Sequence, residues 1–276
     1  MRGWTSKAVY MVLMALVASS VLWVQQTFYD SDIASYEEVA LGKYGYRERQ
    51  PLTPWEKRKL TRALEWARRI PVNTRRLSCE YVIYYKNRQG KSRVIFVSRM
   101  RCTGWNGPGR AFALNPALCR LLDNPIINLE NRIAWRYGEL IPWSQARSIL
   151  GMFDIALVTD VNTGKSFWVQ RRGGTNHADV QPLTARDSRI MKSIYQGKWS
   201  WERRAIIVAC RNRRVAASMN GMPHGAGAIG DNDFDGHFCI HFYGSKTHRG
   251  NRVDERHQNM VLEAAGRERQ RGKADD

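Results

Sequence analysis

The sequence predicts an α+β fold with three parts: an apolar N-terminal helix, a mixed α/β region, and a mostly-β C-terminal half. Three observations support this prediction. The chain has 276 residues and 43% are hydrophobic, which is enough for more than one packed core. One uncharged run near the N-terminus is long enough to be a membrane helix. Short β-branched and aromatic runs, separated by turn residues, are most regular after residue 150.

The apolar run near the N-terminus predicts export. Arg2 and Lys7 precede an uncharged segment at 8–24, AVYMVLMALVASSVLWV. A positive region followed by such a run is typical of a secretory signal. Because the run continues past its small residues, an uncleaved membrane anchor is favoured. We therefore expect residues 1–26 to be a signal peptide or anchor and the rest to be extracytoplasmic, or secreted if the run is cleaved.

The charge of the chain favours an anionic partner. Lys and Arg number 44 against 25 Asp and Glu, which gives a formal net charge of +19. Such a surface attracts an anionic wall polymer, an anionic membrane surface or nucleic acid. An exported chain without a stacking-aromatic motif disfavours nucleic acid. The hydrophobic content excludes wholesale disorder and collagen-like or coiled-coil classes.

We expect residues 27–150 to form an accessory region, because no recognisable group of catalytic or metal-binding residues occurs there. The elements expected in it are a helix over 53–70 capped by Thr53, a hairpin over 79–98, a loop over 104–109 and weakly periodic helices over 115–151.

The five cysteines are Cys79, Cys102, Cys119, Cys210 and Cys239. Export permits a disulfide among the first three, and an odd number leaves one thiol over. The sequence does not fix the pairing. No CxxC motif occurs, so a zinc ribbon or a thioredoxin-like motif has no support.

Residues 151–265 predict a second domain rich in strands. The elements expected there and after it are a hairpin over 154–170, a helix over 184–196 with Thr184 and Asp187 as a capping box, Gly197 as its stop, a hairpin over 205–221, a strand over 237–242 and a disordered charged tail over 266–276.

The last predicted strand carries the most informative residues. Side chains alternate along a strand, so His237, Cys239 and His241 project from one face, and the intervening apolar residues point into a core. Imidazole groups near a thiol favour the thiolate, which is its nucleophilic form. The pattern therefore indicates a reactive cysteine.

A second imidazole lies upstream in the glycine-rich loop PHGAGAIG. A flexible loop can bring His224 to Cys239 as a general base. Backbone N–H groups around Phe238 and Cys239 are expected to stabilise an oxyanion. Together these groups predict a Cys-His acyl-transfer site.

Further residues are expected around this site. Ser218 and Asn220 precede the glycine-rich loop and are expected to orient His224. His177 and Asp179 follow a Gly-Gly turn and are expected to lie in a loop near the cleft, as supporting residues or as metal ligands.

Zinc chemistry is the alternative, with His177, Asp179, His224 and His237 as ligands. Residues at i and i+4 of a regular strand lie ~13 Å apart. His237 and His241 therefore cannot bind one ion together. This geometry favours a site without a cofactor.

Residues 224–242 resemble the signature of the L,D-transpeptidase (YkuD-type) catalytic domain. The pairs His224-Gly225 and Ile229-Gly230, then His237 and Cys239, stand in the order of that signature. The resemblance implies an exported, mostly-β enzyme that attacks peptidoglycan stem peptides and passes the acyl group to an amine. Carried over by position, Cys239 is the nucleophile, His224 the base, and His237 supports the thiolate or the substrate. Backbone groups near residues 236–238 complete the site that the resemblance implies.

The sequence departs from this signature at three positions. Gly236 replaces a Ser or Thr, and Phe238 replaces the Gly before the cysteine. His241 stands where Arg or Asn is expected, which would alter recognition of the substrate carboxylate. These departures leave a transpeptidase, a hydrolase and an inactive relative open. A non-catalytic basic protein that binds an anionic wall polymer is the third class.

Overall fold

The computed structural model describes residues 36–268, apart from residues 66, 72, 75, 76, 108, 109 and 249. The predicted signal or anchor at 8–24 lies outside these residues, as do residues 269–276 of the predicted tail. Within the described part of the chain, no helix is long and apolar enough to cross a membrane.

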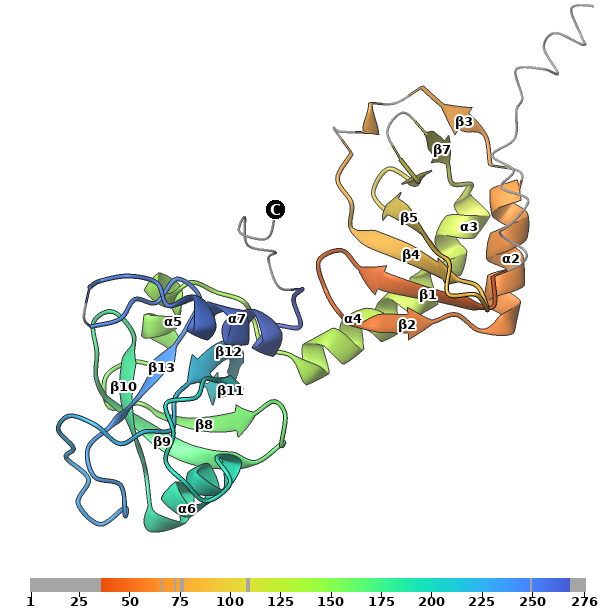
Figure 1. The fold of residues 1–276 in the computed structure, drawn as a ribbon. Coiled ribbons are helices and arrows are strands. Elements are labelled where there is room, and N and C mark those ends of the chain that lie inside the picture. Colours follow the sequence, from red (N-terminus) through yellow and green to blue (C-terminus); the bar gives the residue numbers. More distant parts are fainter. Residues whose placement is uncertain are drawn as a thin grey trace, which may run out of the picture. The chain divides into compact units, whose positions relative to one another are not determined.

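The chain forms two compact units (Figure 1). Of the described residues, the N-terminal unit contains residues 36–44 and Glu48–Asn131, and the C-terminal unit contains Gly45–Arg47 and residues 132–268. The structure thus divides the chain earlier than the boundary predicted near residue 150. Helix α5 (Trp143–Ile149) belongs to the C-terminal unit, where Trp143 and Ile149 are part of the core.

The N-terminal unit is built on a seven-stranded antiparallel sheet with strand order β2-β1-β4-β5-β6-β7-β3. Its strands are β1 Glu38–Lys43, β2 Arg49–Pro51, β3 Arg69–Ile70, β4 Tyr81–Lys86, β5 Ser92–Ser98, β6 Thr103–Trp105 and β7 Ala111–Ala113, and its helices are α2 Pro54–Glu65, α3 Pro116–Leu121 and the first part of α4 Asp123–Arg136.

Local sequence signals place most of this unit correctly. Strands β4 and β5 form the predicted hairpin, and helix α2 begins at the predicted cap. The Thr53 hydroxyl accepts a hydrogen bond from the Glu56 N–H, and the Glu56 carboxylate accepts one from the Thr53 N–H. Two expectations were wrong. The helix ends at Glu65 because residues 69–70 pair with β7, and the predicted loop over 104–109 begins inside β6.

All five cysteines lie in the described part of the chain, and all are free thiols. The expected disulfide among the first three is therefore not formed. The Cys119 thiol is hydrogen-bonded with Cys102, and burial, followed by this hydrogen bond, raises the pKa of Cys119 to about 12. The Cys119 thiol is therefore a poor nucleophile at neutral pH.

The C-terminal unit is a closed, six-stranded antiparallel barrel with order β10-β13-β12-β11-β8-β9. Its strands are β8 Ile155–Asp160, β9 Ser166–Gly173, β10 Ala178–Pro182, β11 Arg204–Cys210, β12 Arg213–Met219 and β13 Phe238–His241, and its later helices are α6 Ala185–Ile194 and α7 Glu255–Ala264.

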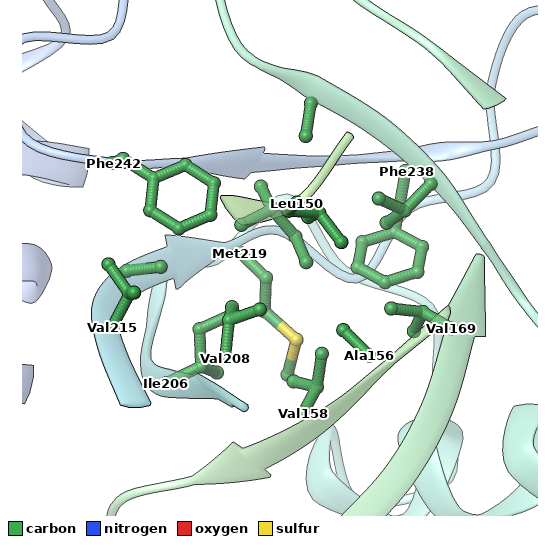
Figure 2. Packing of buried hydrophobic residues seen from close by; sticks show 14 of the residues in the cluster. Leu150, Ala156, Val158, Val169, Ile206, Val208, Val215, Met219, Phe238 and Phe242 are labelled. Carbon is green, nitrogen blue, oxygen red and sulfur yellow. The ribbon is translucent and has the colours of Figure 1, made fainter. Parts of the chain in front are cut away.

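The core of this unit fills the barrel (Figure 2). Alternate residues of every strand point inward, so Val158, Phe167, Met219 and Phe238 are buried together. The rings of Phe167 and Phe238 lie 6.2 Å apart. The other face of β11 and β12 packs against α7 through small alanine side chains. The mixed α and β class of the prediction is confirmed at this level.

The two hairpins predicted in this half are strands β8–β9 and β11–β12. Helix α6 begins with the predicted capping box, in which the Thr184 hydroxyl accepts from the Asp187 N–H at 3.2 Å. Gly197 follows with a φ of +81°, which suits a glycine just beyond a helix end.

Three expectations for this half need correction. Asp179 lies in strand β10, not in a loop, because β10 pairs with both β9 and β13. Strand β13 spans Phe238–His241, which is shorter than the predicted 237–242. Residues 266–268 are hydrogen-bonded, with the Gly266 carbonyl accepting from the Arg47 N–H at 2.9 Å, so this part of the tail is ordered.

Candidate active site

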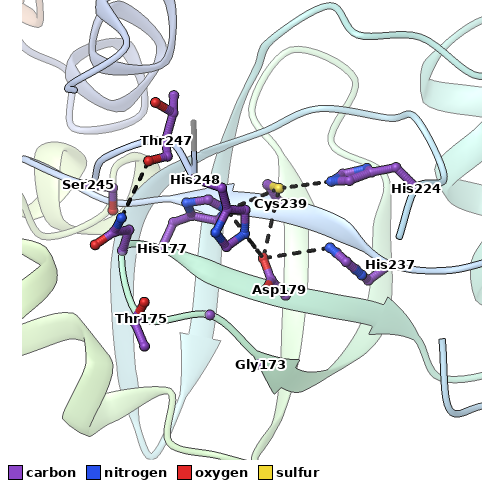
Figure 3. Close-up of polar contacts among 12 residues, drawn as sticks. Gly173, Thr175, His177, Asp179, His224, His237, Cys239, Ser245, Thr247 and His248 are labelled. Carbon is purple, nitrogen blue, oxygen red and sulfur yellow. Dashed lines mark hydrogen bonds and ion pairs between the residues drawn. The ribbon is translucent and has the colours of Figure 1, made fainter. Parts of the chain in front are cut away.

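All six histidines of the chain lie in the C-terminal unit and form one connected cluster with Cys239 and Asp179. Figure 3 shows four of them, His177, His224, His237 and His248, around Cys239 and Asp179. The members of the cluster come from β10, β13 and the segments beside them; they are His177, Asp179, His224, His237, Cys239, His241, His248 and His257.

Strand pairing places the cysteine opposite the carboxylate. Cys239 on β13 is the direct cross-strand partner of Asp179 on β10. Phe238 and Ile240 point into the barrel, as the alternation predicts, and Cys239 therefore points away from the core. This pairing joins two parts of the chain that are far apart in sequence.

The Cys239 sulfur lies between two imidazoles. Its Sγ is 3.1 Å from His177 Nε2 and 3.2 Å from His224 Nε2. The other ring nitrogens face backbone carbonyls, with His177 Nδ1 2.7 Å from the Lys246 oxygen and His224 Nδ1 2.8 Å from the Met222 oxygen. Because a carbonyl only accepts, Nδ1 carries the hydrogen in both rings and Nε2 faces the sulfur.

These contacts favour an ion pair of thiolate and imidazolium. Burial opposes ionisation of Cys239, but the hydrogen bonds and charges of His177 and His224 outweigh it and lower the pKa of the thiol. Burial likewise opposes charging of His177, but hydrogen bonds to Asp179 and Cys239 raise its pKa to about 10. The hydrogen bond to Cys239 raises the pKa of His224.

Asp179 is the second negative charge of the cluster. Its Oδ1 lies 3.2 Å from His177 Nε2, 3.2 Å from His248 Nε2 and 3.8 Å from His237 Nε2. Although burial raises its pKa, the hydrogen bond to His177 and nearby imidazole charge leave the pKa of Asp179 below its usual value. The carboxylate thus stabilises the charged form of His177.

His237 lies beside the reactive pair. Its Nδ1 is 2.9 Å from the Ala226 carbonyl oxygen, and its ring centroid is 4.6 Å from that of His224. Gly225 has a φ of +65°, and a Cβ there would collide with the His237 ring. A glycine is therefore needed for this ring to pack where it does.

His241, expected to bind substrate or to support the site, lies buried within the cluster. It is 3% exposed and stacks between His177, at 4.3 Å, and His257, at 3.8 Å. Burial and the neighbouring charges lower its pKa, so the ring is neutral. Its contribution is to pack behind His177.

The structure corrects the expected hydrogen-bond partners of His224. Ser218 bonds to His257 Nδ1 at 2.8 Å, and the buried Asn220 Oδ1 has no hydrogen-bond partner among the described residues. The Met222 carbonyl orients His224 instead. The His237 N–H donates to the His224 carbonyl at 2.8 Å, so it is not available as an oxyanion donor.

A cavity of about 610 Å³ is formed by the segment that carries His224 and ends just before His237. It is lined by Trp199, Pro223, residues 227–230 and residues 233–236, and neither histidine is among the lining residues. A second cleft of about 480 Å³ includes Trp201, whose ring lies 5.0 Å from that of His224. Both volumes suit a small-molecule or peptide ligand.

Three overlapping groups have donor atoms close enough to hold a metal ion. They are His177, Cys239 and His241; His224, His237 and Cys239; and His177, Asp179 and His248. The zinc ligands proposed from the sequence are divided between the last two groups. None of the three groups contains both His237 and His241, as the strand geometry predicts.

The sequence reasoning missed His248, His257 and Trp201 as members or neighbours of the site. His248 follows Cys239 closely in the chain, but no spacing rule connects it with Asp179. The ring of Trp201 lies 5.0 Å from that of His224 through a tertiary contact that no local pattern specifies.

Comparison with known proteins identified no relative of this chain. No protein-family model, no curated protein and no solved structure matches the chain. Function is therefore inferred from the geometry of the site and from the resemblance carried by residues 224–242.

Proposed function

We propose that the C-terminal unit catalyses cysteine-dependent acyl transfer, with Cys239 as nucleophile and His224 as general acid and base. The observation that carries the proposal is the position of the Cys239 sulfur, within 3.2 Å of two imidazole Nε2 atoms. A thiolate held by imidazolium is the activated form that cysteine enzymes use.

The chemistry follows from these positions. The thiolate attacks a peptide carbonyl carbon and forms a C–S bond. The C–N bond then breaks, and the leaving amine takes its proton from His224 Nε2. An amine or a water molecule next attacks the thioester, gives its proton to His224, and releases the Cys239 thiolate. His177, supported by Asp179, keeps a positive charge beside the sulfur.

The substrate class is proposed from the L,D-transpeptidase resemblance. His224-Gly225, His237 and Cys239 stand in the order of that family's signature, and a strand-rich unit carries them. We therefore propose an L,D-transpeptidase-like fold that acts on peptidoglycan stem peptides. The proposed extracytoplasmic location rests on the signal or anchor predicted at 8–24. This reaction requires no cofactor.

The test is turnover of purified peptidoglycan stem peptides, followed by mass spectrometry of the products. Cys239→Ala is expected to abolish turnover, and His224→Ala to lower kcat by about 10²–10⁴-fold. Cys210→Ala is the matched control, because this thiol is buried in the same unit outside the cluster. Unchanged turnover in Cys239→Ala would contradict the proposal. Salt-sensitive polymer binding without any turnover would favour the non-catalytic alternative.

One observation favours zinc-dependent hydrolysis as a second candidate. His177, His224 and His237 all direct Nδ1 to a backbone carbonyl and present Nε2 to the cluster. Metal-binding histidines are commonly held in this way. Stoichiometric zinc in the purified protein, with turnover lost to a chelator, would replace the acyl-transfer proposal. Turnover that survives chelation would retain it.

A further inference from the structure

The N-terminal unit contains a groove that the catalytic proposal does not use. It has a volume of about 580 Å³ and lies between α2 and α3. Its walls are mostly apolar, with cations among them; the lining residues are Trp55, Lys59, Arg62, Ala63, Asn115, Ala117, Leu118, Arg120 and Leu121.

The apolar part of the groove is open to solvent. Trp55 is 55% exposed, although it is one of the largest apolar side chains of the unit. Leu121 is partly exposed beside it, and the buried Leu118 also lines the groove. An exposed apolar hollow of this kind indicates a ligand with an apolar portion.

All charged side chains that line the groove are positive. Lys59, Arg62 and Arg120 line it, and no acidic side chain does. Lys59 lies over the Trp55 ring at 5.9 Å. Among the described residues, none of these three cations forms an ion pair with a carboxylate. The ligand that complements the groove therefore combines an anion with an apolar chain.

We propose that this groove binds one acidic phospholipid, with its phosphate at the three cations and an acyl chain along Trp55 and Leu121. A linear anionic wall polymer would bind along a row of cations, but it would make no favourable contact with the apolar walls of the groove. A lipid also suits the order of the chain, because the segment predicted to be a membrane anchor, 8–24, precedes this unit. The proposal does not depend on the catalytic function.

The test is native mass spectrometry of the full chain in detergent with added phosphatidylglycerol. We expect one bound lipid per chain and weaker binding of phosphatidylcholine. The triple variant Lys59→Gln, Arg62→Gln, Arg120→Gln is expected to bind phosphatidylglycerol about 10²-fold more weakly. The matched control is Arg58→Gln, Arg101→Gln, Arg110→Gln, which removes the same charge from exposed residues outside the groove and is expected to bind normally.

Three results would overturn the proposal. Equal losses in the two triple variants would indicate nonspecific charge attraction. Equal binding of phosphatidylcholine would exclude the anionic requirement. Complete competition by glycerol phosphate at the same concentration would indicate a phosphate site that makes no use of an acyl chain. Because all substituted side chains are exposed, the variants are expected to fold, and circular dichroism checks this.

Discussion

At the scale of single residues, the central feature is one thiol whose surroundings differ from those of the other cysteines. Burial raises the pKa of Cys79 to about 11 and that of Cys119 to about 12, whereas two imidazoles lower that of Cys239. Cys239 is 6% exposed, so only a small part of its surface is in contact with solvent. Reactivity should therefore be specific to this position.

The pH dependence of the thiolate is the first prediction. A lowered pKa means that the Cys239 thiolate persists as pH falls below the ordinary value of ~8.5 and is lost only below its own pKa. The His177 imidazolium persists as pH rises and is lost near pH 10. We expect the ion pair between these limits. Thiolate absorbance against pH, with Cys239→Ala subtracted, measures the lower limit.

The same titration separates the contributions of the two imidazoles. His177→Ala and His224→Ala should each move the midpoint of Cys239 ionisation upward, because each removes a neighbouring positive charge. A midpoint that stays at the ordinary value in the unmodified protein would contradict the proposed ion pair.

Gly225, in the glycine-rich loop, gives a second prediction. Gly225→Ala places a Cβ against the His237 ring at a positive φ, which costs roughly 1–2 kcal/mol. We expect stem-peptide turnover to fall by about 10²-fold, because small displacements of reacting groups have effects of that size. Gly164→Ala is the control, since Gly164 also has a positive φ, of +69°, lies in the turn between β8 and β9, and has nothing within 4 Å of its Cβ. Equal turnover of the two variants would contradict the packing role of Gly225.

At the scale of elements, the barrel strands are stabilised because alternate apolar side chains are buried inside the barrel, while the residues between them point outward. Phe167 on β9 is 1% exposed inside the barrel, whereas the next residue, Trp168, is 48% exposed. Phe167→Ala should destabilise the C-terminal unit by about 3–5 kcal/mol, because it leaves a cavity. Trp168→Ala should cost less than about 1 kcal/mol. Denaturant unfolding, followed for this unit, compares them, and equal losses would contradict the assigned faces.

An element could be predicted from the sequence where local interactions define it, and could not where contacts with distant residues define it. Hairpins β4–β5, β8–β9 and β11–β12 were predictable because alternation and turn residues are local signals. Strand β10 was not, because it carries Gln181 and Pro182 where apolar residues are usual. Gln181 is buried only because its side-chain oxygen accepts from the Ala228 N–H at 2.7 Å, a tertiary contact.

The site was predictable to a similar degree. The alternation of β13 placed His237 and Cys239 on one face, and the flexible loop indicated that His224 could reach the sulfur. The direct contact of His177 with Cys239 depends on the pairing of β10 with β13. No local pattern specifies which distant strands pair, so His177 and Asp179 were expected only nearby.

At the scale of the whole molecule, two units carry two different kinds of site. The C-terminal unit contains all six histidines and the reactive thiol, and the N-terminal unit contains the basic apolar groove. Under the proposals above, the net charge of +19 and the anchor expected at 8–24 would hold the chain at an anionic membrane, with the proposed acyl-transfer site acting on the wall outside it.

The most direct test of the account is the intact mass of the full chain after exposure to a carbapenem. Compounds of this class acylate the cysteine of L,D-transpeptidases, the family whose signature residues 224–242 resemble. The account predicts one covalent adduct that maps to Cys239, is absent from Cys239→Ala and persists in Cys210→Ala. An adduct at another thiol, or no adduct on a folded protein, would contradict Cys239 as the acylated nucleophile.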